Sequence, residues 1–124
     1  MKQKILVVDD EPDQILTVKY SLNDISNDYE VIGAESGNKL FKILENEELP
    51  DVILLDIMIP EIDGLEIFKK LKENSKWEKI PVIFVTARSD KLSLEYKEKI
   101  GNNYIEKPFE IIDLKTMLDK ILKT

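Results

Sequence analysis

Five short runs of apolar, mostly β-branched residues recur along the chain, and each is followed by a segment with helical spacing. Runs of this length suit strands that are buried on both faces of a parallel sheet. They cover residues 5–8, 31–34, 52–55, 82–85 and, more weakly, 104–105. Strand and helix thus alternate over 124 residues, which predicts one α/β domain whose strands are joined by right-handed crossovers.

The segments between the runs carry apolar residues at intervals of three and four, as the buried face of a helix requires. Pro12 suits the first turn of one helix, Ser36 and Gly37 open a second, and a third follows Gly64. Residues 89–100 have a more ragged apolar stripe, and we predict a fourth helix there. The fifth helix has the clearest stripe, which consists of Ile111, Leu114, Leu118 and Ile121.

The composition excludes several classes of function. The chain has no cysteine and no histidine, so thiolate chemistry and the common transition-metal ligands are absent. Its formal net charge of −7, without any basic run, argues against direct binding of nucleic acid. Only four apolar residues follow the polar N-terminus, far fewer than a signal peptide or a membrane span needs. We therefore expect a cytoplasmic protein that makes no membrane contact.

Polar residues follow four of the five runs, at the strand ends where open parallel sheets bind ligands. They are Asp9, Asp10 and Glu11 after the first run, Asp56 after the third, Thr86 after the fourth and Lys107 after the fifth. Neighbouring carboxylates repel one another unless a cation lies between them. An all-oxygen site favours Mg²⁺, with Mn²⁺ as the alternative. A cation, a carboxylate, a hydroxyl and a lysine are together the groups that handle a phosphoryl group.

Each of these residues also has a purely structural interpretation. Asp9 and Asp10 could cap the helix that follows them, since aspartate favours that position. Thr86 could be a strand-end hydroxyl, and Lys107 with the following proline could form an ordinary turn. Asp56 is harder to explain in this way, because apolar residues flank it on both sides and an isolated buried carboxylate is costly.

Four stretches of the sequence together resemble the receiver domain of two-component response regulators. They are ILVVDDEP at residues 5–12, LDIMIPEIDG at residues 55–64, TA at residues 86–87 and YIEKPF at residues 104–109. The resemblance covers the whole chain and implies a single receiver domain over residues 1–124. It implies a doubly wound, flavodoxin-like sheet of five parallel strands in the order 2-1-3-4-5, flanked by five helices.

The resemblance also implies roles for individual residues. Asp56 would accept a phosphoryl group from the phosphohistidine of a sensor histidine kinase or a phosphotransfer protein. Asp10, the Asp56 carboxylate and the backbone carbonyl of Met58 would bind Mg²⁺ directly. Asp9 would act mainly through a bound water molecule. The chain would take part in its own phosphorylation and dephosphorylation without turning over small substrates.

Signalling would follow from the new charge at Asp56. Thr86 would move toward the phosphoryl oxygens, Lys107 would pair with them, and Tyr104 would turn inward. The face formed by the fourth helix, the fifth strand and the fifth helix would change as a result. The resemblance leaves two outputs open: binding of a downstream effector or output domain, and a phosphorylation-dependent homodimer. It also implies a cis peptide bond between Lys107 and Pro108.

Met58 and Arg88 depart from common family patterns. In the family, these two positions border the path of the water that attacks the phosphoryl group. We therefore expect slow self-dephosphorylation. One rival is a phosphohydrolase of the haloacid dehalogenase type, but that class needs an Asp-x-Asp arrangement after the first strand, which Asp9 and Asp10 do not provide. The other rival is an interaction module of the same fold that works without phosphorylation.

Overall fold

The computed structural model of the protein describes residues 2–46, 48–57, 64–87, 98, 101 and 103–122. Its sheet contains five parallel strands in the order β2-β1-β3-β4-β5, which confirms the predicted topology. The strands are β1 (Gln3–Val8), β2 (Tyr29–Ala34), β3 (Val52–Asp56), β4 (Val82–Thr86) and β5 (Tyr104–Glu106).

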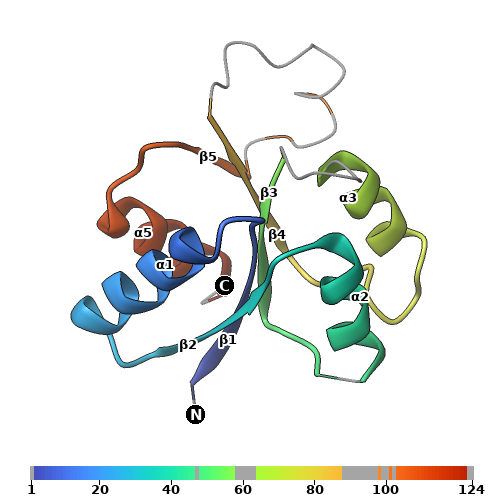
Figure 1. Cartoon of the computed structure of the whole chain (residues 1–124), viewed down its shortest axis with the longest axis horizontal. Helices are drawn as coiled ribbons and strands as arrows, with labels where there is room; N and C mark the ends of the chain where they lie inside the picture. Colours follow the sequence, from blue (N-terminus) through green and yellow to red (C-terminus); the bar gives the residue numbers. More distant parts are fainter. Residues whose placement is uncertain are drawn as a thin grey trace.

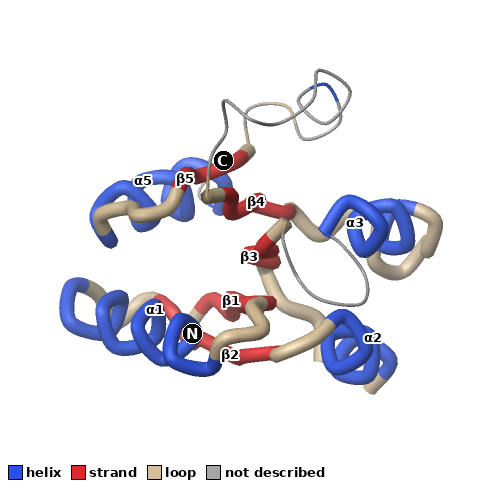
Figure 2. Tube along the Cα trace, turned by 45° about the horizontal axis from the view of Figure 1, so that its top comes forward, coloured by secondary structure: helices blue, strands red, loops and turns tan. Residues whose placement is uncertain are grey.

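Helices cover both faces of this sheet. As Figures 1 and 2 show, α1 (Pro12–Ile25) and α5 (Ile111–Leu122) lie on one face, and α2 (Gly37–Glu45) and α3 (Gly64–Lys72) lie on the other. The predicted start of α2 is confirmed, because the Ser36 hydroxyl accepts a hydrogen bond of 3.1 Å from the backbone N–H of Lys39. The helix predicted over residues 89–100 lies outside the described residues, apart from residue 98.

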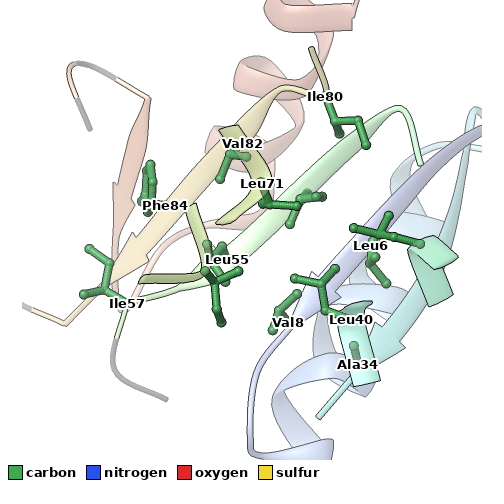
Figure 3. Packing of buried hydrophobic residues seen from close by; sticks show 13 residues of the cluster. Leu6, Val8, Ala34, Leu40, Leu55, Ile57, Leu71, Ile80, Val82 and Phe84 are labelled. Atoms are coloured by element: carbon green, nitrogen blue, oxygen red, sulfur yellow. The ribbon is translucent and has the colours of Figure 1, made fainter. Parts of the chain in front are cut away.

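The two faces of the sheet bury separate hydrophobic clusters, because successive side chains of a strand point to opposite sides. Leu6 and Val8 of β1 belong to the cluster under α2 and α3, where they lie beside Leu40 (Figure 3). Ile5 and Val7 belong to the cluster under α1 and α5. All four residues are at most 3% exposed. Burial on both faces explains why the strands appear in the sequence as continuous apolar runs.

The strands are longer than the apolar runs that predicted them. β2 begins at Tyr29, which is 1% exposed although Asp28 and Glu30 flank it in the sequence. β5 extends to Glu106, whose side chain is exposed. Among the described helices, none combines the length and the apolar character that crossing a lipid bilayer requires.

Candidate functional site

The register of β1 and β3 brings two carboxylates together. Val8 of β1 pairs with Leu55 of β3, so the next residues, Asp9 and Asp56, lie side by side at the carboxyl edge of the sheet. The backbone N–H of Asp9 donates a hydrogen bond of 3.1 Å to the carbonyl oxygen of Ala34, at the end of β2. This hydrogen bond ties the backbone of Asp9 to the end of β2. The adjacency of Asp9 and Asp56 confirms the predicted convergence of the two residues.

Asp10 completes an acidic cluster with these two residues. One carboxylate oxygen from each of Asp9, Asp10 and Asp56 lies within 4.8 Å of the others. The three differ in exposure: Asp9 is 6% exposed, Asp56 is half-buried and Asp10 is exposed. Three carboxylates at this separation repel one another strongly unless a cation compensates them, more so where two of them are shielded from water.

The helix-capping interpretation of the aspartate pair is wrong. The N-cap residue of α1 is Glu11, whose side chain makes no capping hydrogen bond. Asp9 Oδ1 instead accepts a hydrogen bond of 3.0 Å from the backbone N–H of Glu11, which orients the carboxylate toward the cluster. The helix begins with Pro12, whose fixed backbone angle favours a first turn without a side-chain cap.

Lys107 supplies a positive charge to the cluster. Its ammonium Nζ lies 3.2 Å from Asp9 Oδ2 and 3.1 Å from Asp56 Oδ2, and so bridges the two less exposed carboxylates. The lysine follows the last residue of β5, and its backbone N–H donates a hydrogen bond of 2.7 Å to the carbonyl oxygen of Thr86. The Lys107–Pro108 peptide bond is cis, as the family resemblance implied.

The protonation of Lys107 depends on the balance between burial and its two partners. Burial lowers the pKa of the ammonium, since removal from water disfavours the charged form. The hydrogen bond and the charge of Asp56, and then those of Asp9, act in the opposite direction and outweigh burial, so the pKa of Lys107 is raised overall. The lysine is accordingly a fixed cation at neutral pH.

Thr86 lies on β4, the strand next to β3, and Tyr104 lies on β5, the strand beyond it. Thr86 is the last residue of β4, is 3% exposed, and follows Val85, the pairing partner of Asp56. Tyr104 begins β5 opposite Phe84, is half-buried, and packs against the cluster under α2 and α3. Because Phe84 and Thr86 are two residues apart in one strand, Thr86 points to the face on which Tyr104 packs.

The acidic cluster has the chemistry of a site for a hard divalent cation. All its donors are carboxylate oxygens, which Mg²⁺ and Mn²⁺ prefer, and the described residues near it contribute no nitrogen or sulfur ligand. The donor set therefore fits Mg²⁺. Lys107 contacts two of the three carboxylates, so it already offsets part of their negative charge.

Gly64 is a site-forming residue whose role the sequence analysis did not find, since it placed Gly64 only at the start of a helix. A Cβ atom at this position would lie 2.8 Å from Ile57 Cα and 2.9 Å from the Asp56 carbonyl oxygen. The backbone N–H of Gly64 also donates a hydrogen bond of 2.9 Å to the carbonyl oxygen of Ile57. Only glycine lets α3 begin this close to the end of β3. The Asp-Gly pair at residues 63–64 was the available sequence signal.

The sequence matches a known protein family over most of its length. The model of the response regulator receiver domain family matches residues 5–119. The chain belongs to this family. Receiver domains act in two-component signalling, which identifies the chain as a signalling domain.

The receiver domain has curated relatives of different lengths. It is 37% identical to a chemotaxis protein CheY homologue of Campylobacter jejuni, over 98% of this chain and 93% of the relative. It is 33% identical to the alkaline phosphatase synthesis transcriptional regulatory protein PhoP of Bacillus subtilis, over 99% of this chain. In the second case the receiver domain spans half of the relative's length.

Solved structures share the fold of the receiver domain. A putative response regulator from Chloroflexus aurantiacus has a TM-score of 0.86 and 27% identity, and the match covers all of both chains. The receiver domain of a Pseudomonas aeruginosa sensor histidine kinase has a TM-score of 0.83 and 25% identity, again over all of both chains. That structure was determined with a magnesium ion coordinated in its active-site cleft.

Some predicted features of the receiver domain lie outside the described residues. These are the backbone carbonyl of Met58 as a metal ligand, Arg88, and the predicted fourth helix apart from residue 98. The structure brings Asp9, Asp10, Asp56, Thr86 and Lys107 to one edge of the sheet, whereas Tyr104 lies at the start of β5. We treat the roles of these residues below as proposals.

Proposed function

We propose that residues 1–124 form one receiver domain that works as a phosphorylation-dependent switch, with Asp56 as the phosphoryl acceptor. The observation that carries this proposal is the bridging of Asp56 and Asp9 by Lys107, next to the exposed carboxylate of Asp10. A half-buried carboxylate that a lysine orients among further acids is a nucleophile with cation-binding groups around it. Partly buried charges at the end of a strand cost free energy, which is hard to explain unless they have a chemical role.

In the proposed reaction, a carboxylate oxygen of Asp56 attacks the phosphorus of a phosphohistidine on a sensor histidine kinase or a phosphotransfer protein. The new O–P bond forms as the P–N bond breaks, and the electron pair of that bond remains on the imidazole nitrogen. Lys107 pairs with the transferred phosphoryl oxygens, and the Thr86 hydroxyl donates a hydrogen bond to another of them. Water later breaks the new O–P bond, which releases inorganic phosphate and restores the Asp56 carboxylate, and the chain does not turn over small substrates.

Asp10, the Asp56 carboxylate and the Met58 carbonyl would hold Mg²⁺ directly, and Asp9 would hold it through water. The ion, when bound, supplies positive charge that offsets the charge on the phosphoryl oxygens. Mn²⁺ would serve the same purpose, because it shares the preference for oxygen ligands. The carboxylate cluster within 4.8 Å supports this assignment.

The proposed output depends on the packing of Tyr104. Thr86 and Tyr104 share a face of the sheet, so a shift of Thr86 toward the phosphoryl group opens space for the tyrosine ring. This changes the surface formed by the fourth helix, β5 and α5. We propose that a downstream effector, an attached output domain or a second phosphorylated copy reads this surface. The chain spans half of the PhoP relative, which supports an attached output domain. It spans 93% of the CheY homologue, which supports a separate effector.

Incubation with acetyl phosphate and Mg²⁺, followed by intact-mass measurement, tests the proposal. We expect the mass to increase by one phosphoryl group. The increase should disappear in Asp56→Ala and after chelation of the metal. Asp24→Asn is a matched control, because it removes an exposed carboxylate on α1 outside the acidic cluster.

A mass increase of one phosphoryl group in Asp56→Ala would overturn the assignment of Asp56 as the acceptor. No mass increase in the wild type would instead favour an interaction module that works without phosphorylation. The experiment would then be repeated with a histidine-phosphorylated kinase domain in place of acetyl phosphate. This repeat would be decisive, because phosphohistidine is the proposed phosphoryl donor.

A further inference from the structure

A small cavity lies beneath Lys107, on the side that faces α1. Its volume is about 20 Å³, and its polar lining consists of Asp9, Gln14, Asp56 and Lys107. The rest of the lining is apolar and comes from β1, α1, β3, β4 and Phe109. A cavity needs roughly 10–15 Å³ and two to four polar partners to hold one water molecule. The volume of this cavity meets the first condition, and four polar residues line it.

Lys107 has a hydrogen-bond donor to spare for such a water molecule. A lysine ammonium carries three N–H donors. Among the described residues, Asp9 Oδ2 and Asp56 Oδ2 accept two of them. A water molecule in the cavity would be next to the ammonium and able to accept the third.

Gln14 is placed to hold this water molecule. It lines the small cavity and also a groove of about 620 Å³ that runs between α1 and residues 107–111. Val18, Lys107 and Phe109 line both spaces as well, but Gln14 alone among these four offers an uncharged side chain with both a donor and an acceptor. The backbone N–H of Gln14 donates a hydrogen bond of 3.0 Å to the Glu11 carbonyl oxygen, which fixes its position in the first turn of α1.

We propose that Gln14 is a positioning residue of the phosphoryl-transfer site, whose amide orients the Lys107 ammonium toward Asp9 and Asp56 through one water molecule in this cavity. The lysine then has three fixed partners, which limits its rotation before the phosphoryl group arrives. The consequence for phosphoryl transfer rests on the function proposed above. The geometric part, the link from Gln14 to Lys107, stands without it.

The variant Gln14→Met tests the proposal, because methionine keeps the length of the side chain and removes the amide. Gln14 is exposed, so the substitution should leave the melting temperature unchanged. The first measurement is the exchange of the Lys107 ammonium protons with water, followed by NMR on protein labelled with ¹⁵N-lysine at low temperature and mildly acidic pH. We expect exchange to be about three- to tenfold faster in the variant, the range that corresponds to loss of one hydrogen bond.

The second measurement is the initial rate at which acetyl phosphate and Mg²⁺ phosphorylate the protein, which we expect to fall about three- to tenfold in Gln14→Met. Ser21→Ala is the matched control, because Ser21 lines the groove on the same helix but does not line the cavity. Both measurements should give wild-type values for this variant. An equal effect in Ser21→Ala would overturn the proposal, since it would reflect the groove rather than the cavity.

Unchanged proton exchange in Gln14→Met would overturn the link between Gln14 and Lys107. Faster exchange with an unchanged phosphorylation rate would overturn the role of Gln14 in phosphoryl transfer. Failure of the wild type to accept a phosphoryl group would be a failure of the proposed function instead. The proton-exchange measurement involves no phosphoryl group and would still decide the geometric part of the proposal.

Discussion

The phenol of Tyr29, at the start of β2, donates a hydrogen bond to Asp119 Oδ1 on α5, across 90 positions of the sequence. The second oxygen of the same carboxylate lies 2.6 Å from the ammonium of Lys115, one helical turn earlier. Burial and then the Asp119 carboxylate raise the pKa of Tyr29 above its ordinary value. This chain of contacts ties α5 to the strand on the far edge of the sheet.

Replacement of Tyr29 by phenylalanine should lower the free energy of unfolding by about 1–2 kcal/mol at neutral pH, because it removes a hydrogen bond to a charged group. The pKa of Tyr29 is raised in the folded state, so its contribution is complete below the unfolded value of about 10 and is lost as the pH rises above it. Urea unfolding between neutral and alkaline pH should therefore show the two proteins converging above about pH 10. Tyr20→Phe, which changes a tyrosine that is 62% exposed, should behave as the wild type does.

Replacement of Asp56 by asparagine should lower the pKa of Lys107, because the hydrogen bond and charge of Asp56 are the largest causes that raise it. The raised pKa stabilises the fold below the unfolded value of about 10.4 and loses this effect as the pH rises through the folded value. NMR titration of the lysine side chain measures the shift directly. Asp51→Asn is the control. Asp51 accepts a hydrogen bond from the Lys4 backbone, near the start of β1, and is not among the groups that shift the pKa of Lys107. A Lys107 pKa that is the same in Asp56→Asn and the wild type would contradict the bridging geometry.

Magnesium should raise the melting temperature of the protein, since a ligand that binds only the folded state stabilises it. The gain is about 2.7 kcal/mol at a free concentration one hundred times the Kd. Asp10→Asn should abolish most of the gain, because Asp10 belongs to the acidic cluster and is exposed. Melting curves over a series of Mg²⁺ concentrations give the result, with Asp24→Asn as the control. Equal magnesium responses in Asp10→Asn and the wild type would remove Asp10 from the ligand set.

Replacement of Gly64 by alanine should destabilise the protein by about 1–3 kcal/mol, because the added methyl group would overlap the backbone of Asp56 and Ile57. Relief of the overlap displaces the end of β3, so phosphorylation by acetyl phosphate should also slow. Lys69→Ala, at an exposed position of the same helix, should leave both stability and phosphorylation unchanged. Wild-type stability in Gly64→Ala would mean that α3 can shift at little cost.

The residues at the strand ends could be predicted from the sequence because each lies at or just beyond the end of an apolar run. Asp9, Asp56 and Thr86 needed only the positions of the apolar runs and the rule that parallel strands end at one edge. Lys107 was found in the same way, although β5 has only three residues. The order of the strands came from the family resemblance, since no local pattern specifies which strands are neighbours.

Other features depend on contacts between distant segments and leave little trace in local sequence. In the sequence, Tyr29 lies between two acidic residues, which suggests partial exposure. Its burial and its hydrogen bond to Asp119 depend on the position of α5. The backbone approach at Gly64 and the cavity next to Gln14 follow from where α3 and α1 pack on the sheet. Periodicity predicts that these helices exist, but it does not predict their distance from the strand ends.

The bridge from Lys107 to Asp9 and Asp56 has a consequence for how the domain behaves between signals. A cluster of acids without a cation of its own needs an external one to offset the repulsion between its carboxylates. Here the chain carries an internal counter-ion, because the Lys107 ammonium contacts one oxygen of Asp9 and one of Asp56. Two of the three carboxylates thus have a positively charged partner that belongs to the chain itself. We therefore expect Asp9 and Asp56 to keep their arrangement when no metal ion is bound.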